Sequence, residues 1–382
     1  MNKLLKFSGI GVALLILATA ILYFSDPVFW FRYFNVRPLE SYQNNPFPTK
    51  DRMFPQEVVE GAKSPRVIPV ASKEERTIPA NLLKRAKETA KIFDSTSFIY
   101  IHNGVIQSEH YWPDSVKNGP VHAFSMSKTV AALLTGIAID QKLIGSVDDP
   151  VGDYIEEWKD DERGQKITIR HLLTMSSGFE PTPYFSKNPF WKGQKRQIGT
   201  NLTKTALSYE LVEEPGSKWE YNGTNTYLLG LIIERTSKMR YTEYLSKHLW
   251  QPVGNASANM WMDREGGVPR TFVGIYAAPM DWVRLGLMML NDGKAGETQI
   301  VSSNWIRSMI EPAATASYYG FQIWLAVPNQ EDNPPGNYYL FNGFGGQTVF
   351  TDPSKQIIIV RTGPLARNSD GFLNALPELL PN

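Results

Sequence analysis

Residues 125–141 read SMSKTVAALLTGIAIDQ. Apolar side chains run along most of the circumference that this stretch would have as an α-helix, so we expect a helix buried in the middle of a domain. The stretch begins with an S-x-x-K motif, in which Ser125 stands three positions before Lys128. This spacing places the two side chains on one face of the helix, where the amine can reach the hydroxyl.

The Ser125 hydroxyl and the Lys128 amine are a candidate nucleophile and general base. A serine hydroxyl is a poor nucleophile at neutral pH, and a neutral amine beside it can accept its proton as attack begins. A lysine does this only when burial or a nearby cation lowers its pKa, and the dipole at a helix N-terminus acts in the same direction. The competing interpretation is that Ser125 only caps the helix.

The composition excludes several other chemistries. The 382 residues include no cysteine, which rules out a thiolate nucleophile, a disulfide and a Cys-ligated metal centre. Only five histidines occur and none forms a close ligand pair, so we expect no metal and no other cofactor. With 39 basic and 38 acidic residues the net charge is +1, which gives nucleic acid nothing to bind. A small neutral substrate fits this balance.

Strand and helix patterns on both sides of 125–141 indicate the fold class. A helical pattern begins near residue 78, and it is followed by FIYIHNGVIQSEHYW (98–112), in which Asn103-Gly104 predicts a hairpin turn. The stretch 148–294 is mostly helical, with helices expected at 169–175, 227–236, 241–250 and 278–290. Strand patterns return at 321–327, 346–351 and 357–361. We therefore expect an α+β protein, an antiparallel β-sheet flanked by helices with a mainly helical lobe beside it.

Two segments downstream of the motif carry a family resemblance. They are Asp149-Pro150 and ITIRHLLTMSSG (167–178). With the S-x-x-K helix, they make the sequence resemble the serine β-lactamase and penicillin-binding protein family from about residue 90 to 363. The branch it is most similar to is that of the class C β-lactamase-related hydrolases, which include 6-aminohexanoate-dimer hydrolases, esterases and D-aminopeptidases. The resemblance implies a β-lactamase/transpeptidase-like fold. In that fold His171 is expected to be a buried histidine with a structural role.

The family's second motif is Y-x-N, shortly before an L-L-G helix. The segment WEYNGTNTYLLG (219–230) puts Tyr221 in the tyrosine position, where the resemblance implies a phenol that shares protons with Ser125 and Lys128. A structural tyrosine is the competing interpretation. The third position is Gly223 rather than asparagine, a departure that disfavours a β-lactamase more than it disfavours a hydrolase in general.

The family's third motif, K-T-G or H-x-G, lines the cleft on an edge strand. The best match is Gly343-Phe344-Gly345 in FNGFGGQTVFTDP (341–353), where the resemblance implies that the Phe344 N–H completes an oxyanion hole with the N–H of Ser125. No lysine or histidine stands at the first position, so the usual cationic anchor for a substrate carboxylate is missing. Arg361-Thr362-Gly363 looks more like K-T-G, but we expect it to be structural because too little chain follows it.

Three functions fit these motifs. The first is a serine hydrolase that cleaves amide or ester bonds of a small molecule through an acyl-enzyme on Ser125. The second is a β-lactamase or D-Ala-D-Ala carboxypeptidase. The third is a non-catalytic envelope protein that uses the cleft only for binding. From the resemblance, Tyr184, Phe185, Trp191 and Tyr276 are further candidates for the cleft walls.

The N-terminal segment has the pattern of a membrane anchor. Lys3 and Lys6 precede an uncharged run at 7–24, long enough to cross a bilayer as a helix, and an aromatic cluster, Phe29-Trp30-Phe31, follows. A cleaved signal peptide is the competing interpretation. Either would place the catalytic part in the periplasm or outside the cell. We divide the chain into an anchor or signal segment (1–26), a linker and N-terminal extension (27–79) and a hydrolase domain (80–382). The sequence indicates no oligomeric state.

Overall fold

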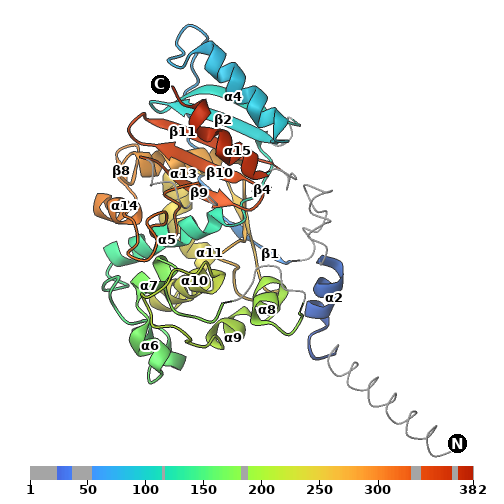
Figure 1. The fold of residues 1–382 in the computed structure, drawn as a ribbon, viewed down its shortest axis with the longest axis vertical. Coiled ribbons are helices and arrows are strands. Elements are labelled where there is room, and N and C mark those ends of the chain that lie inside the picture. The colour runs from blue at the N-terminus through green and yellow to red at the C-terminus, as the bar shows by residue number, and fades with distance from the viewer. Residues whose placement is uncertain are drawn as a thin grey trace, which may run out of the picture.

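The larger sheet of the fold is antiparallel and has five strands. The computed structural model describes residues 24–36, 54–113, 117–181, 188–327, 337–363 and 369–381. The strand order is β3-β2-β11-β10-β9, and every neighbouring pair is antiparallel. The strands are β2 (Ser97–His102), β3 (Val105–Tyr111), β9 (Tyr339–Gly343), β10 (Gln347–Asp352) and β11 (Ile357–Thr362). The sheet therefore joins two strands from near residue 100 to three from the C-terminal part (Figure 1).

The hairpin between β2 and β3 is the one that the sequence predicts. Asn103 and Gly104 both have positive φ, 52° and 77°, as the two central residues of a type I′ turn require. Glycine adopts this conformation without a steric penalty, and asparagine tolerates it better than most residues.

Both faces of the sheet are buried. Along β2, Ile99 and Ile101 face the main core, whereas Phe98 and Tyr100 face a second cluster on the opposite side. That second cluster is covered by α4 (Ala80–Ile92), α15 (Ser369–Ala375) and the short η6 (Leu376–Leu379) (Figure 1). The period-two alternation thus feeds two cores, one on each face of the sheet.

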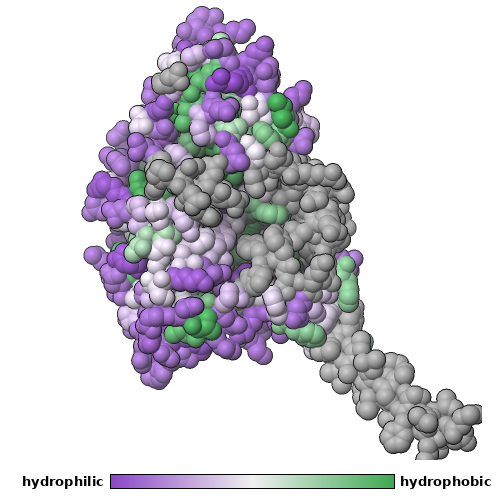
Figure 2. All heavy atoms as spheres, in the orientation of Figure 1, coloured by the Kyte–Doolittle hydropathy of each residue, from purple (hydrophilic) through white to green (hydrophobic). Residues whose placement is uncertain are grey.

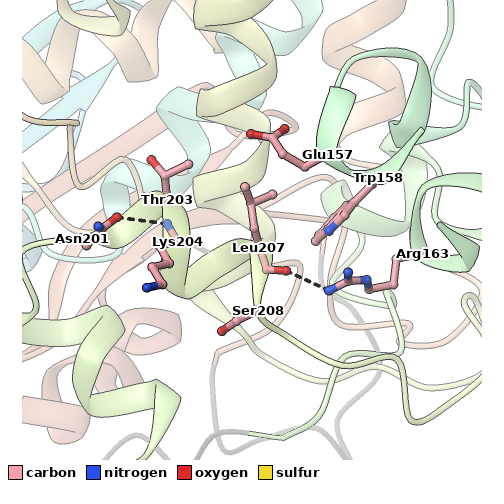
Figure 3. Close-up of a pocket in the computed structure, with 8 residues that line it drawn as sticks. All are labelled: Glu157, Trp158, Arg163, Asn201, Thr203, Lys204, Leu207 and Ser208. Carbon is pink, nitrogen blue, oxygen red and sulfur yellow. Dashed lines mark hydrogen bonds between the residues drawn. The ribbon is translucent and has the colours of Figure 1, made fainter. Parts of the chain in front are cut away.

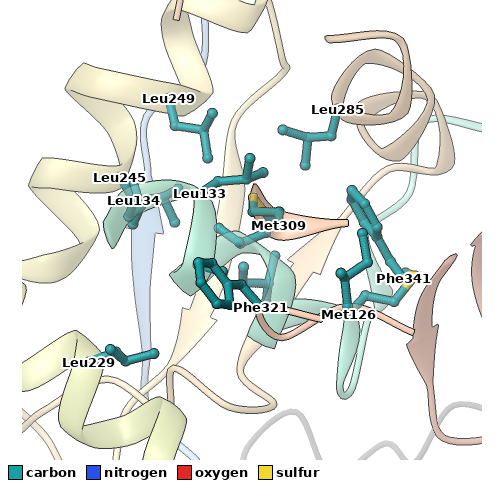
Figure 4. Packing of buried hydrophobic residues seen from close by; sticks show 14 of the residues in the cluster. Met126, Leu133, Leu134, Leu229, Leu245, Leu249, Leu285, Met309, Phe321 and Phe341 are labelled. Atoms are coloured by element: carbon teal, nitrogen blue, oxygen red, sulfur yellow. The ribbon is translucent and has the colours of Figure 1, made fainter. Parts of the chain in front are cut away.

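Helix α5 (Met126–Asp140) runs through the main core, as its apolar circumference predicts. Residues Met126 to Ala138 are all buried. Figure 4 shows Leu133 and Leu134 among side chains from the helical lobe, and Met126 next to Phe341 of β9. Against the same sheet packs α13 (Pro279–Leu290), which contacts β10 and β11.

A mainly helical lobe lies below the sheet in Figure 1 and contains the middle of the chain. Its elements are η3 (Val151–Asp153), η4 (Glu156–Trp158), α6 (Glu162–Lys166), α7 (Ile169–Leu173), α8 (Lys192–Ile198), α9 (Leu202–Leu207), α10 (Gly223–Ser237), α11 (Tyr241–Leu245), η5 (Ser246–Trp250) and α12 (Gln251–Val253). Beyond α13 follow β7 (Lys294–Ala295), β8 (Thr298–Gln299) and α14 (Ser303–Met309). In Figure 2 the surface over α4 and α6, at the two ends of the view, is mostly hydrophilic. The predicted α+β class, with a sheet and a helical lobe, is confirmed.

A second, smaller sheet has the strand order β1-β5-β6-β4. Its strands are β1 (Gln56–Val59), β4 (Val121–His122), β5 (Ala258–Trp261) and β6 (Ile275–Ala277). Part of the predicted N-terminal extension is thus paired with the domain, because β1 pairs with β5. At the opposite edge of this sheet, β4 ends at His122, three positions before Ser125.

Helix α7 begins with a capping box. The Thr168 hydroxyl accepts a hydrogen bond from the His171 N–H at 3.3 Å, and the Thr168 N–H donates to His171 Nδ1 at 3.2 Å. Two backbone donors at the helix start are thus satisfied. His171 has the structural role that the sequence predicts.

The strand predicted at 321–327 is wrong. Only Trp324 in this stretch forms bridges, one to Tyr319 and one to Leu340. The edge strand is instead β9, which begins at Tyr339. An apolar run indicates burial but not which neighbour supplies the hydrogen-bond ladder, and here β10 pairs with β9.

The predicted transmembrane helix is wrong. The structure therefore also contradicts the prediction of a membrane-anchored catalytic domain that faces the periplasm or cell exterior. In the part of the chain that the structure describes, no helix combines the length and the apolar character needed to cross a bilayer. The predicted span 7–24 lies outside the described residues except for Phe24.

The aromatic cluster that suggested a membrane interface is partly packed within the protein, through Phe29 and Trp30, while Phe31 is 56% exposed. It lies on α2 (Pro27–Val36), where Phe29 and Tyr33 are each only 5% exposed and pack with Trp261 and Tyr276. The buried Arg32 donates to the carbonyl oxygens of Ile198 and Asp263 at 3.0 and 2.8 Å. These contacts dock α2 against the domain beside α8 (Figure 1).

We expect Asp281→Ala to lower the free energy of unfolding by about 3–5 kcal/mol, the usual effect of removing one partner of a buried ion pair. The buried Asp281 carboxylate accepts hydrogen bonds from the Ala256 and Ala278 N–H groups and pairs with Arg284 at 2.6 Å. Denaturant unfolding followed by circular dichroism measures the loss. The control is Glu88→Ala, which removes the exposed Lys84–Glu88 pair and should change the free energy by less than about 0.5 kcal/mol. Equal losses in the two variants would contradict the prediction.

Candidate active site

Ser125 lies between strand β4 and helix α5. Strand β4 pairs with β6, and the next residue, Ala123, donates its N–H to the Ile275 carbonyl at 2.9 Å. On the other side of Ser125, the Ser127 hydroxyl accepts a hydrogen bond from the Ile275 N–H at 3.2 Å. The backbone on both sides of the candidate nucleophile is therefore tied to one residue of β6.

The turn into α5 has an uncommon backbone conformation. Phe124 has a φ of 48°, in the left-handed region that bulky residues rarely adopt. Such a residue costs about 1–3 kcal/mol and persists only where the surrounding structure holds it, commonly at functional sites. Ser125 occupies the N-cap position, yet its side chain makes no capping hydrogen bond. Its hydroxyl is thus not used for the role that the competing interpretation gives it.

Lys128 points its amine at Ser125 from within the core. The Lys128 Nζ lies 3.0 Å from the Ser125 Oγ and donates to the Phe272 carbonyl at 2.8 Å. The Lys128 residue is only 1% exposed. Burial, and after it the charge of Arg196, lowers the pKa of the Lys128 amine well below its ordinary value of 10.5. Both the short distance to Ser125 and the lowered pKa are features that a general base needs.

The Tyr221 ring lies beside this amine, with its centroid 4.9 Å from the Lys128 Nζ. Tyr221 comes just before α10, on the helical lobe. On its other side the ring packs in an aromatic cluster, 6.0 Å from Trp219 and 5.7 Å from Trp324 between ring centroids. The structure thus brings the three predicted side chains together from α5 and from the start of α10.

The departure at Gly223 has a steric explanation. A Cβ atom on Gly223 would stand 2.9 Å from a ring carbon of Phe272, so a larger side chain does not fit without a shift. The residue that caps α10 is instead Asn222, whose side-chain oxygen accepts the Thr224 N–H at 3.0 Å. The space that an asparagine would fill in the family's second motif is occupied by the Phe272 ring.

The third motif lies at the end of β9, against the turn that precedes Ser125. A Cβ atom on Gly343 would overlap the Ala123 carbonyl oxygen, so this close approach requires glycine. The Phe344 ring is partly exposed and packs edge-on against Phe124, at 5.9 Å between ring centroids. Gly345 has a φ of 80° in the turn to β10. Gly343, Phe344 and Gly345 therefore adjoin the backbone of the candidate nucleophile.

The segment Arg361-Thr362-Gly363, which resembles K-T-G in sequence, forms hydrogen bonds to the turn that contains the third motif and to Gln347 just after it. The Arg361 guanidinium is fully buried and donates to the carbonyl oxygen of Gly345 and to that of Phe93, the second at 2.7 Å. Gly363 donates its N–H to the Gln347 side chain at 3.0 Å. In the structure, Arg361-Thr362-Gly363 holds the glycine turn in place.

Two contributors to the site carry no sequence signal. One is the Phe272 carbonyl, which accepts from Lys128. The other is Arg196, whose charge acts on the Lys128 amine from α8. Arg196 stands in KGQKRQI, a stretch whose composition is typical of a solvated helix face. No spacing rule connects it to the S-x-x-K motif, so only the tertiary structure finds it.

No contact with Ser125, Lys128 or Tyr221 supports the remaining candidates for the cleft walls among the described residues. Tyr184 and Phe185 lie outside the described residues. Trp191 precedes α8, and Tyr276 is buried against His122, at 4.4 Å between ring centroids. Among the described residues, no group of three His, Cys, Asp or Glu side chains is placed to hold a metal ion.

A surface pocket of about 470 Å³ lies elsewhere, in the helical lobe (Figure 3). Two of its charged side chains, Arg163 and Glu157, already have partners. Arg163 donates to the Leu207 carbonyl at 2.7 Å and pairs with Asp161, while Glu157 pairs with Arg235. We assign this pocket no chemical role.

The fold and the site together define a class of protein. An antiparallel sheet covered on both faces, with a Ser-Lys pair at the start of the buried central helix, is the arrangement of the serine β-lactamases and penicillin-binding proteins. The chain belongs to the beta-lactamase family, since the family model described as Beta-lactamase matches residues 86–363. The resemblance that the sequence motifs indicate is confirmed, and the chain is a member of a hydrolase family.

Individual relatives have names from several branches of this family. The 6-aminohexanoate-dimer hydrolase of Paenarthrobacter ureafaciens is 24% identical over 303 residues, 74% of this chain and 74% of that protein. Protein flp of Staphylococcus aureus strain MW2 is 31% identical over 143 residues, 36% of this chain and 28% of flp.

Solved structures share the fold. A Bacillus anthracis protein, provisionally identified as a 6-aminohexanoate-dimer hydrolase, has a TM-score of 0.69 at 19% identity and covers 90% of this chain and 95% of its own. EstCE1, described as a hydrolase with promiscuous acyltransferase activity, has a TM-score of 0.61 at 17% identity, covering 78% of this chain and 98% of its own.

Proposed function

We propose that the protein is a serine hydrolase that cleaves amide or ester bonds of small molecules through an acyl-enzyme on Ser125. One observation carries the proposal: a buried lysine with a lowered pKa lies 3.0 Å from the Ser125 hydroxyl. A lysine on the surface would be protonated at neutral pH and could not accept the hydroxyl proton. Burial penalises the charged form of this amine, and so favours the neutral base that the chemistry needs.

In the acylation step the Ser125 oxygen attacks the substrate carbonyl while Lys128 accepts the hydroxyl proton. The negative charge that develops on the carbonyl oxygen is stabilised by two backbone donors, the N–H groups of Ser125 and Phe344. The close approach of Gly343 to Ala123 supports this pairing of donors. The C–O or C–N bond then breaks, and the leaving group takes a proton from Tyr221, which recovers one from Lys128.

In the deacylation step a water molecule attacks the ester carbonyl of the acyl-enzyme. Its proton passes to the Tyr221–Lys128 pair, and the Ser125 oxygen leaves and regains its proton. The product is the free acid. Both steps use the same three side chains, and after each turnover Ser125, Lys128 and Tyr221 have returned to their starting protonation states.

The same geometry bears on the β-lactamase or D-Ala-D-Ala carboxypeptidase alternative. The Phe272 ring occupies the space beside Gly223, and Gly343 offers no cation for a substrate carboxylate. Both features favour neutral amide or ester substrates over β-lactams and D-Ala-D-Ala peptides, which carry a carboxylate.

Mass spectrometry of the intact protein after exposure to a fluorophosphonate or an activated ester tests the proposal. We expect one adduct per chain, mapped to Ser125 by peptide analysis, because this hydroxyl has a buried lysine amine with a lowered pKa beside it. The control is Ser303→Ala, which removes a hydroxyl on α14 that the site does not use and should be labelled like the parent protein.

Absence of labelling by every reagent would favour the non-catalytic binding protein, and an adduct on another residue would reject Ser125 as the nucleophile. A fluorescent penicillin and nitrocefin in the same panel separate the two enzymatic functions. Stoichiometric penicillin labelling, or fast nitrocefin turnover, would reverse our ranking of them.

A further inference from the structure

Arg196 is a buried charge close to the catalytic lysine. It lies in the last turn of α8 and is 1% exposed. Its guanidinium donates to the Asn222 side-chain oxygen, to the Tyr209 hydroxyl at 3.3 Å and to the Thr224 hydroxyl at 3.4 Å. These acceptors are neutral oxygens, so the hydrogen bonds orient the guanidinium without cancelling its charge.

Arg196 and Lys128 adjoin the same aromatic ring. The Lys128 Nζ and the Arg196 Cζ each lie 5.8 Å from the centroid of Phe272. A second buried cation beside the same ring disfavours protonation of the amine.

The fold holds Arg196 in this position at the backbone. The buried guanidinium of Arg270 donates to the Arg196 and Gln197 carbonyls, both at 2.8 Å, and to the Gly199 carbonyl at 2.6 Å. Arg270 stands two residues before Phe272, whose carbonyl accepts from Lys128. The loop 270–272 therefore both accepts a hydrogen bond from Lys128 and donates hydrogen bonds to the end of α8.

Few other groups act on the amine in the described chain. The segment before α10 presents the Tyr221 ring, α8 presents Arg196, and residue 272 presents its backbone carbonyl. None of the ion pairs among the described residues involves Lys128. Its protonation is therefore sensitive to the charge at position 196.

We propose that Arg196 is a positioning residue for acylation, whose buried charge keeps the Lys128 amine neutral and whose hydrogen bond to Asn222 fixes the backbone beside Tyr221. This inference rests on the proposed function, because it assigns a role within the same proton transfers. It adds a fourth side chain to a site whose motifs name three.

The test is the pH dependence of kcat/KM for an activated ester in Arg196→Gln. Lys128 acts only when neutral, so kcat/KM falls on the acidic side as the amine becomes protonated. Removal of the neighbouring cation raises the amine's pKa, and we expect the acidic limb to move upward by about one pH unit. Near neutrality kcat/KM should fall about tenfold and recover at alkaline pH. If kcat/KM instead fell equally at every pH, with the acidic limb of the profile unchanged, the role of Arg196 would be merely structural and the inference would be overturned.

A second pair of variants keeps the test decisive if Arg196→Gln does not fold. Thr224→Asp places a carboxylate where a hydroxyl now accepts from Arg196, and Thr224→Asn is the neutral control of nearly the same shape. The aspartate should neutralise the guanidinium and move the acidic limb upward, while the asparagine should leave it in place. Limbs that coincide in the two variants would overturn the inference.

Failure of the inference and failure of the proposed function are distinguishable. If Ser125→Ala abolishes turnover but neither Arg196→Gln nor Thr224→Asp moves the limb, only the role of Arg196 is rejected. If Ser125→Ala retains full turnover, the proposed function itself is rejected.

Discussion

Ser125→Ala is expected to lower kcat/KM for a chromogenic ester by about 10⁴-fold or more. The substitution removes the oxygen that forms the acyl-enzyme and leaves the Lys128 amine without a proton to accept. Stabilisation of the transition state by the backbone N–H groups would remain, so a small residual rate above that in water is expected. Initial rates with a p-nitrophenyl ester measure the effect.

The fold should survive this change. The Ser125 side chain makes no capping hydrogen bond, so its loss does not uncap α5. We expect the thermal unfolding midpoint of Ser125→Ala to match that of the parent within a few degrees. Ser303→Ala is the control for kinetics, since it deletes a hydroxyl on α14 that the site does not use and should keep the activity of the parent. Full activity in Ser125→Ala would remove the mechanism.

Lys128→Met is expected to lower kcat/KM by about 10²–10⁴-fold, the range that a general base supplies. Methionine fills nearly the same volume without an amine. Lys128→Arg is the matched variant that keeps a cation, and it should be as inactive because a guanidinium stays protonated at neutral pH. The double variant Ser125→Ala/Lys128→Met should be no worse than Ser125→Ala alone, because the pair acts as one unit. Activity in Lys128→Arg close to that of the parent would contradict the assignment.

Lys128 should also make the free energy of unfolding depend on pH. Its folded-state pKa lies well below the ordinary 10.5, so between these two values the unfolded chain binds more protons than the folded one. Stability therefore rises as pH rises through that window, and Lys128 contributes least at lower pH. We expect Lys128→Met to show a weaker rise in unfolding free energy with pH than the parent does. Equal slopes would mean that the folded-state pKa is not lowered.

Much of the fold could be predicted because its signals are local. The apolar circumference of 125–141 indicates burial whatever surrounds it, and the whole of α5 up to Ala138 is buried. Asn103-Gly104 specifies a tight turn by its own backbone preferences. The S-x-x-K spacing brings two side chains together through helix geometry alone.

Other features could not be predicted because they depend on distant partners. The apolar run at 321–327 does not form a strand, since Tyr339–Gly343 pairs with β10 instead. The cluster Phe29-Trp30-Phe31 resembles a membrane interface until the partners of Phe29 and Trp30 on the domain are known. Periodicity reports that a side chain is buried but not what buries it.

The sequence by itself determined the class of chemistry: a hydroxyl and an amine at the start of a buried helix, with no cysteine or metal-binding pattern to compete with them. The tertiary structure decided what surrounds that amine and so lowers its pKa. Burial of Lys128, the Phe272 carbonyl that receives it and the Arg196 charge beside it come from segments far apart in the chain. A pKa depends on all charges and dipoles within several ångströms, and only folding brings those together.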